Sequence, residues 1–362
     1  MKRLFTLLNL GMLLLVLTTF LYACENSETP IAESEYQTET GSNEVERSPD
    51  EPIRIGFAMD TLTEERWLKD RDYFEESVEA LGAEVEIMTS HGDDALQIWQ
   101  AETMISHGID LLVIVPHNAE STAAIVEKAH SAGIKVLSYD RLVKNAAVDM
   151  YVSYDNEQVG VLQAQAITSL VPKGKYVYIG GAETDNNAHM VKKGVFSVLQ
   201  PLINNGDITI VFDQWTKDWL PVNAKENMEL ALDANNNEID AVIAANDATA
   251  GAVIEVLEER GLAGVIPVAG QDADLAAVQR ILKGTQTLTV YKPIKELTMI
   301  AAELAIALAR EEEIGRFMNV NNGKMEVPSI LLKPIIVDQS NVDETIIADE
   351  FHTREEIYLE NN

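Results

Sequence analysis

Short apolar runs alternate with longer amphipathic stretches along most of the chain, from Ile53 to about Arg310. The apolar runs have the length of strands and contain few polar residues, which is typical of strands buried on both faces of a parallel sheet. The stretches between them follow the helical pattern of apolar positions. The expected strands span residues 53–58, 84–89, 110–115, 134–138, 152–154, 175–181, 208–214, 239–247, 264–272, 287–292 and 329–337.

This alternation of strands and helices predicts an α/β protein with two doubly wound parallel sheets. The strands are too many for one comfortable sheet, and a polar break falls near residues 155–160. No long Gly/Ser-rich linker separates the two halves, so we expect short hinges between them. Beyond Arg310 the pattern weakens: residues 311–327 are expected to be rich in loops, and the chain from Asp338 onward is acidic.

The first residues have the pattern of a processing signal. Lys2 and Arg3 precede an apolar run that ends just before Cys24, so we expect residues 1–23 to be a signal peptide. Cys24 is the single cysteine of the chain, which excludes an intramolecular disulfide. Its position resembles a bacterial lipobox, in which the thiol is acylated and becomes the new N-terminus. An uncleaved membrane anchor and an incidental buried thiol are the alternatives.

Residues 24–52 are rich in Glu, Ser and Thr and nearly free of apolar side chains, which predicts a disordered acidic tether after the lipidated cysteine. The whole chain has a formal net charge of -32. Nucleic-acid binding needs a basic surface, so this charge argues against it, and it argues equally against adhesion to anionic lipid. Solubility is the simplest explanation of the acidic composition.

Familiar catalytic and cofactor motifs are absent from the sequence. The six histidines show no spacing typical of a zinc site. No phosphate-binding glycine loop and no GxSxG motif occurs, so we expect no cofactor, no metal and no catalysis. Paired carboxylates can hydrolyse glycosides, but that reaction needs one carboxyl with a raised pKa. We expect Arg141 and Lys292 to lower the pKa values of the candidate carboxyls beside them.

Polar and aromatic side chains follow nearly every expected strand. In open α/β sheets, ligands bind beyond the carboxyl ends of the strands, where these residues would lie. Carboxylates, amides, cations and indoles together suit a sugar, because each hydroxyl both donates and accepts hydrogen bonds while the ring packs on an aromatic face. The residues are Asp60, Arg66, Trp67, His117, Asn118, Tyr139, Asp140, Arg141, those at 183–187 and 213–219, Asn246, Asp247, Gln271, Asp272, Tyr291 and Lys292.

Each of these residues also has a plainer interpretation. Asp140 and Arg141 are adjacent and could form a surface ion pair. Asp247 and Asp274 precede expected helices and suit N-caps, while Asn187 and Asn246 suit turns. Trp67 and Trp219 are the kind of residue that packs in a core or at its rim, and Lys292 could simply close a strand. Their common location at one edge of two sheets favours a shared site.

Several long motifs resemble the D-xylose-binding proteins of bacterial ABC importers (the XylF type), within the type I periplasmic-binding-protein family. The motifs are "FAMDTLTEERWLKDRDYF", "YDRLV", "DNEQVG", "GAETDNNA", "DQWTKDWLP", "AANDATAG", "GQDADLAAVQRILKGTQTLTVYKP" and "NNGKMEVPSILL". The resemblance runs from about Ile53 to Phe351, nearly collinear. It implies two α/β lobes with hinge crossings and a sugar enclosed between them.

The resemblance also implies domain bounds and ligand contacts. Lobe one would comprise residues 53–158 and 293–321, and lobe two residues 159–292 and 322–350, with hinges near 155–159, 290–294 and 320–326 and an acidic tail at 351–362. The family's ligand contacts would fall on Arg66, Asp140, Arg141, Asp185, Asn187, Trp219, Asn246, Asp272 and Lys292, with Trp67 as a further stacking candidate.

By resemblance, the chain would be an exported D-xylose-binding lipoprotein. It would be held at the cell membrane through Cys24, face the outside, act as a monomer and deliver sugar to an ABC permease. The alternative within the binding class is a sugar sensor that signals to a membrane histidine kinase. A transcriptional repressor with the same lobes is rejected, because a secretion signal occupies the place of a DNA-binding segment.

Overall fold

The computed structural model describes residues 51–358. The chain separates into Met1–Pro49 and Asp50–Asn362, and the described residues all belong to the second unit. The expected signal peptide, Cys24 and nearly all of the expected tether lie outside the described residues, as do residues 359–362. Within residues 51–358, no helix combines the length and the hydrophobicity needed to span a bilayer.

The first sheet has seven strands in the order β11-β12-β5-β4-β3-β1-β2. All neighbours pair in parallel except β11, which is antiparallel to β12. The strands are β1 (Arg54–Met59), β2 (Glu84–Thr89), β3 (Leu111–Ile114), β4 (Lys135–Tyr139), β5 (Met150–Tyr154), β11 (Met318–Asn321) and β12 (Glu326–Leu332).

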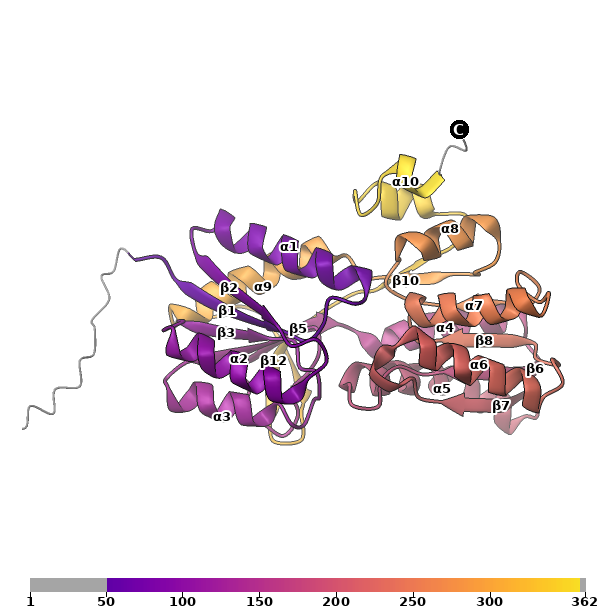
Figure 1. Ribbon diagram of the computed structural model, residues 1–362, viewed down its shortest axis with the longest axis horizontal. Coiled ribbons are helices and arrows are strands. Elements are labelled where there is room, and N and C mark those ends of the chain that lie inside the picture. The colour runs from indigo at the N-terminus through magenta and orange to yellow at the C-terminus, as the bar shows by residue number, and fades with distance from the viewer. Residues whose placement is uncertain (1–50, 359–362) are drawn as a thin grey trace, which may run out of the picture. The chain divides into compact units, whose positions relative to one another are not determined.

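Helices cover both faces of this sheet, which explains its continuous apolar strands (Figure 1). Phe57 and Val113 pack toward α1 (Glu65–Ala80) and α9 (Ile294–Ala309). Their neighbours along the strands, such as Ala58 and Ile114, pack on the opposite face. The helices of that face are α2 (Asp94–Ser106) and α3 (Ala123–Ser131).

The second sheet has four parallel strands in the order β7-β6-β8-β9. A two-stranded ribbon of β10 and β13 adjoins it through a bridge between Ala269 and Leu288. The strands are β6 (Gly174–Ile179), β7 (Ile208–Gln214), β8 (Ala241–Ala244), β9 (Val268–Ala269), β10 (Thr289–Tyr291) and β13 (Ile335–Val337). The helices are α4 (Asn156–Leu170), α5 (Asn186–Asn204), α6 (Pro221–Ala234), α7 (Asp247–Glu259) and α8 (Leu275–Lys283), with a short 3-10 turn at Lys217–Trp219.

The chain passes between the two sheets after β5, after β10 and after β12. The third crossing differs from the expected one near 320–326. Strand β12 pairs in parallel with β5, so residues 322–332 belong to lobe one and not to lobe two. The expected single strand 329–337 is in fact two strands, because Pro334 cannot donate a ladder hydrogen bond and the chain breaks there.

The segment 351–358, expected to be part of an acidic tail, packs on the body of the protein. A single helical turn (Asp343–Ile347) and α10 (Arg354–Tyr358) lead into and through it, and α10 lies beside α8 (Figure 1). Phe351 and Ile357 are buried with Val278 and Tyr291 in one apolar cluster. The acidic composition of this segment gave no sign of packing, because only a few widely spaced apolar residues make its contacts with the rest of the protein.

Candidate functional site

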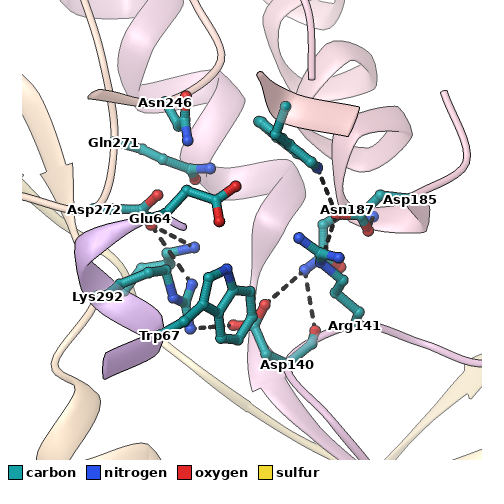
Figure 2. A pocket seen from close by; sticks show the side chains of 12 residues that line it. Glu64, Trp67, Asp140, Arg141, Asp185, Asn187, Asn246, Gln271, Asp272 and Lys292 are labelled. Carbon is teal, nitrogen blue, oxygen red and sulfur yellow. Dashed lines mark hydrogen bonds and ion pairs between the residues drawn. The ribbon is translucent and has the colours of Figure 1, made fainter. Parts of the chain in front are cut away.

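The strand ends of both sheets meet around one pocket, which Figure 2 shows from close by. Parallel strands present their carboxyl ends at one edge, so loops from several strands converge there. The cavity left between these side chains is small, with a volume of about 20 Å³. Its lining residues are Glu64, Arg66, Trp67, Asp140, Arg141, Asp185, Asn187, Trp219, Asn246, Gln271, Asp272 and Lys292.

The structure brings together all ten of the pocket residues expected from the sequence. They come from the ends of β1, β4, β6, β8, β9 and β10, from the starts of the helices that follow, and from the short turn that ends at Trp219. Cys24, the expected lipidation site, lies outside the described residues.

Asp140 and Arg141 do not form the local surface ion pair that was their plainer interpretation. Both are buried, with 2% and 4% of their surfaces exposed, and each has a different partner. Arg66 Nη2 donates to Asp140 Oδ2 at 2.9 Å. Arg141 Nη1 donates to Asp60 Oδ2 at 2.6 Å, and its Nε lies 2.9 Å from Asp185 Oδ2. The strand therefore ends on two separate buried charges.

Arg66, in the first turn of α1, lies among three carboxylates. It contacts Asp70 at 3.0 Å, Asp140 at 2.9 Å and Asp272 at 3.5 Å. Lys292 Nζ lies 2.8 Å from Asp272 Oδ1 and gives that carboxylate a second cation. Such charge-assisted contacts fix the geometry of the pocket floor more firmly than neutral hydrogen bonds would.

The two lobes are in direct contact across the pocket. Arg141 of lobe one meets Asp185 of lobe two, and Arg66 of lobe one meets Asp272 of lobe two. Asn187 Nδ2 donates to Asp140 Oδ1 at 3.1 Å and to the Asp140 carbonyl at the same distance. In Figure 2, Arg141, Asp185 and Asn187 lie together on one side of the pocket, next to Asp140.

The carboxyl pKa values differ within the site. Burial alone would raise the pKa of Asp140, but Arg66, Lys292 and Arg141 outweigh it and hold that pKa below its ordinary value. Burial raises the pKa of Asp185 despite the opposing charge of Arg141. The expectation that neighbouring cations lower carboxyl pKa values therefore holds for Asp140 and is wrong for Asp185.

The two tryptophans of the pocket are held differently. Trp219 Nε1 donates to Asp185 Oδ2 at 3.1 Å. A Cβ atom on Gly181 would lie 2.1 Å from Trp219 Cη2, so glycine there leaves the room that the indole occupies. Trp67 belongs to the core and carries two guanidinium groups over its ring, with Arg66 Cζ at 4.3 Å and Arg141 Cζ at 5.1 Å.

The residues that the sequence suggested as caps divide their roles. Asn246 is the N-cap of α7, and its Oδ1 accepts from the Thr249 backbone N–H at 3.0 Å. Its amide NH₂ is left over for the pocket. Asp247 is not a cap: it accepts from Gln286 Nε2 and Thr289 Oγ1, each at 2.7 Å. Asp274 precedes α8 but makes no side-chain cap bond.

Glu64 and Gln271 also line the pocket, although the sequence did not single them out as contacts. Gln271 follows β9 beside Asp272, so its strand-end position was the available signal. Glu64 precedes α1 and offered no comparable signal. Glu64 Oε2, Gln271 Oε1 and Asn187 Oδ1 are buried acceptors with no hydrogen-bond partner in the described chain. Buried acceptors normally have donors, so the site is suited to a ligand that supplies them.

Other strand-end residues support the pocket from behind or lie elsewhere. His117 Nδ1 lies 2.9 Å from Asp60, which in turn holds Arg141, and this contact raises the pKa of His117. Tyr139 contacts Asp70, and Asn118 caps a turn away from the pocket. Among residues 51–358, no group of three or more His, Cys, Asp or Glu side chains is arranged to hold a metal ion.

Comparison with known proteins identifies the family. A family model described as a periplasmic binding protein domain matches residues 55–313. The D-xylose-binding periplasmic protein of Haemophilus influenzae is 51% identical over 306 residues, which cover 84% of this chain and 92% of that protein. The D-xylose-binding periplasmic protein of Escherichia coli is 48% identical over 305 residues, with the same coverage of 84% and 92%.

A solved structure agrees with these matches. A carbohydrate-transporter solute-binding protein from Chloroflexus aurantiacus, in complex with D-glucose, superimposes with a TM-score of 0.79 at 31% identity and covers 84% of this chain and 98% of its own. The fold is accordingly the type I periplasmic-binding-protein fold, mixed α/β with parallel sheets. By family model, by sequence and by fold, the chain belongs to the periplasmic binding proteins.

Proposed function

We propose that this protein binds a monosaccharide outside the cytoplasm, with D-xylose as the first candidate, and delivers it to an ABC importer. The observation that carries the proposal is the set of three unpartnered buried acceptors, Glu64 Oε2, Asn187 Oδ1 and Gln271 Oε1, in a small pocket that also holds three cations. A ligand with several hydroxyl groups supplies donors to the former and acceptors to the latter. The two relatives named for D-xylose support the choice of sugar.

Each pocket residue has a definite part in this proposal. Asp140 and Asp272 accept hydrogen bonds from sugar hydroxyls through the lone pairs that their cations leave free. Arg66, Arg141 and Lys292 donate to hydroxyl or ring oxygens. The asparagine side chains orient hydroxyls, with Asn246 able to donate only, because its oxygen caps α7. Trp219, held by Asp185, packs against the C–H face of the ring.

We propose that binding closes the lobes around the sugar. Three contacts join the lobes, and each can form only when the lobes are close together. They are Arg141 with Asp185, Asn187 with Asp140, and Arg66 with Asp272. The three crossings between the sheets are short, which suits hinges. A ligand that touches both sets of residues favours the closed form by its differential affinity, and a permease can then recognise that form.

The anchor and the working state are also part of the proposal. A lipidated Cys24 would hold the protein at the outer side of the cell membrane, since two or more acyl chains give firm attachment. The tether at 24–52 would let a monomer reach the permease. We propose binding without turnover, so incubation with xylosides should release no sugar.

Tryptophan fluorescence against a panel of monosaccharides tests the proposal, because Trp67 and Trp219 both line the pocket. We expect a saturable change with D-xylose and weaker or no change with L-arabinose, D-ribose and D-glucose. No saturable change with any monosaccharide would contradict sugar binding, and a stronger response to another sugar would correct the choice of ligand.

A further inference from the structure

Glu64 occupies an unusual place at the start of α1. It is the N-cap residue, yet its side chain makes no hydrogen bond to the helix. Short polar side chains are preferred at that position because they reach back to the free N–H groups of the first turn. Figure 2 instead shows the Glu64 carboxylate directed into the pocket.

One oxygen of the Glu64 carboxylate, Oε2, is buried without a partner. Only 9% of the residue is exposed, and Oε2 has no hydrogen-bond partner among the residues that the structure describes. The neighbouring carboxylates differ: Asp140, Asp185 and Asp272 have cationic nitrogens at 2.9, 2.9 and 2.8 Å. Burial accordingly raises the pKa of Glu64, with the more distant charge of Arg141 opposing it.

A buried carboxylate oxygen without a donor is costly, and an apolar side chain of similar size would pack at lower cost. Capping does not account for this residue, since its side chain makes no cap bond, and Oε2 has no hydrogen-bond partner among the described residues. Its direction into the pocket leaves a bound molecule as the natural source of the missing donor. The Glu64 carboxylate is therefore placed to accept a hydrogen bond from a bound ligand.

We infer that Glu64 accepts a hydrogen bond from one hydroxyl group of the bound monosaccharide and so determines which monosaccharides the pocket accepts. This inference rests on the proposed function of the site. A site that hydrogen-bonds a substrate hydroxyl strongly rejects the analogue that lacks it, because the buried group then stays unpaired. The pocket thus requires a hydroxyl at the ring position that faces Glu64.

The test combines variants of the protein with analogues of the sugar. D-xylose and its 1-, 2-, 3- and 4-deoxy analogues are titrated calorimetrically into the wild-type protein, Glu64→Gln and Glu64→Leu. We expect one analogue to bind the wild type at least about 100-fold more weakly than D-xylose. In Glu64→Leu the same analogue and D-xylose should bind within about threefold of each other, since the partner of that hydroxyl is gone. Glu64→Gln, which keeps an acceptor oxygen, should fall between them.

Glu75→Leu is the matched control, because Glu75 lies on the same helix with its side chain exposed. It should leave every affinity unchanged. We also expect Glu64→Leu to melt at a higher temperature than the wild type without sugar, because the unpaired carboxylate is removed. If Glu64→Leu fails to fold, the ratios of the deoxy-analogue affinities to the D-xylose affinity are compared between Glu64→Gln and the wild type, and this comparison tests the inference.

The possible failures are distinguishable. A wild type that binds D-xylose while both Glu64 variants keep all of its analogue ratios overturns this inference and leaves the proposed function intact. A wild type that binds no monosaccharide overturns the proposed function itself. If another monosaccharide binds best, its own deoxy analogues replace those of xylose.

Discussion

Several pocket residues hold backbone conformations that most side chains avoid. The φ angles of Asp140, Trp219 and Asp272 are 56°, 58° and 96°. Non-glycine residues at positive φ cost free energy, and they persist where the surrounding structure enforces them, often at functional sites. For Asp140 the enforcement is visible: its carbonyl accepts from Tyr151 Oη at 2.9 Å and from Ser153 Oγ at 2.5 Å. The residue types were readable from the sequence, but these turns were not.

Replacing Asp272 by alanine should weaken D-xylose binding by about tenfold or more, equivalent to about 1.4 kcal/mol. The variant removes an acceptor and leaves Lys292 and Arg66 without the carboxylate that both contact. Titration calorimetry measures the change, with Asp72→Ala on the exposed face of α1 as the control. Equal affinities for wild type and Asp272→Ala would remove this residue from the contact set.

The buried carboxyl of Asp247 should make stability depend on pH. Burial raises the pKa of Asp247 from its ordinary 3.8 to about 7, and burial together with Asp247 raises that of the nearby Asp274. The folded protein thus keeps a proton that the unfolded chain has lost. The free energy of unfolding should therefore fall as the pH rises from about 4 to about 7, on the order of 2–4 kcal/mol.

Urea unfolding at several pH values tests this dependence. Asp247→Asn cannot ionise, so its stability should change less between pH 5 and pH 8 than that of the wild type. Asp72→Asn, at an exposed position, should retain the wild-type profile. Parallel profiles for wild type and Asp247→Asn would show that this carboxyl is not the source.

At the scale of elements, the apolar runs predicted the central strands and most helices, because strands buried on both faces leave a clear signal. The edges were harder. Strand β11 (Met318–Asn321) has mostly exposed side chains and no apolar run. Its partner β12 was expected in lobe two, but it belongs to lobe one. Which sheet a strand joins depends on a distant partner, here β5, and no local pattern contains that information.

Gly181→Ala should weaken sugar binding by about tenfold. The new Cβ would lie 2.1 Å from Trp219 Cη2, so the Trp219 indole, which packs against the loop after β6, must shift. The same substitution at Gly315 meets nothing within 4 Å and should have no effect. Fluorescence titration compares the two variants. Wild-type affinity in Gly181→Ala would mean that the exact seat of Trp219 does not matter.

The packed C-terminal segment 351–358 should contribute to the free energy of unfolding. The Phe351 ring lies 4.9 Å from that of Tyr291, and Lys69 Nζ lies 4.7 Å from its centre. Phe351→Ala should lower the free energy of unfolding by about 3–5 kcal/mol. Phe317→Ala, at a residue that is 49% exposed, should change it by less than about 0.5 kcal/mol. Equal urea midpoints for the two variants would argue against this packing.

At the scale of the whole described unit, the site exists only because two lobes supply its halves. The position of Asp140 and Asn246 just after expected strands predicted that they lie at the edges of different sheets. The resemblance to a known family predicted that those edges face each other. Contacts such as that of Arg141 with Asp185 depend on this arrangement, so they cannot be predicted from the sequence of either lobe alone. Glu64 escaped sequence reasoning for the same reason: its isolation is a property of the assembled pocket.

Titration calorimetry of D-xylose into the wild-type protein and Trp219→Ala tests the central claim most directly. We expect the wild type to bind one sugar per chain, and the variant, which loses the aromatic face held by Asp185, to bind about tenfold more weakly or worse. A wild type that releases no binding heat over a range of temperatures, or a variant with undiminished affinity, would contradict a sugar site between the lobes.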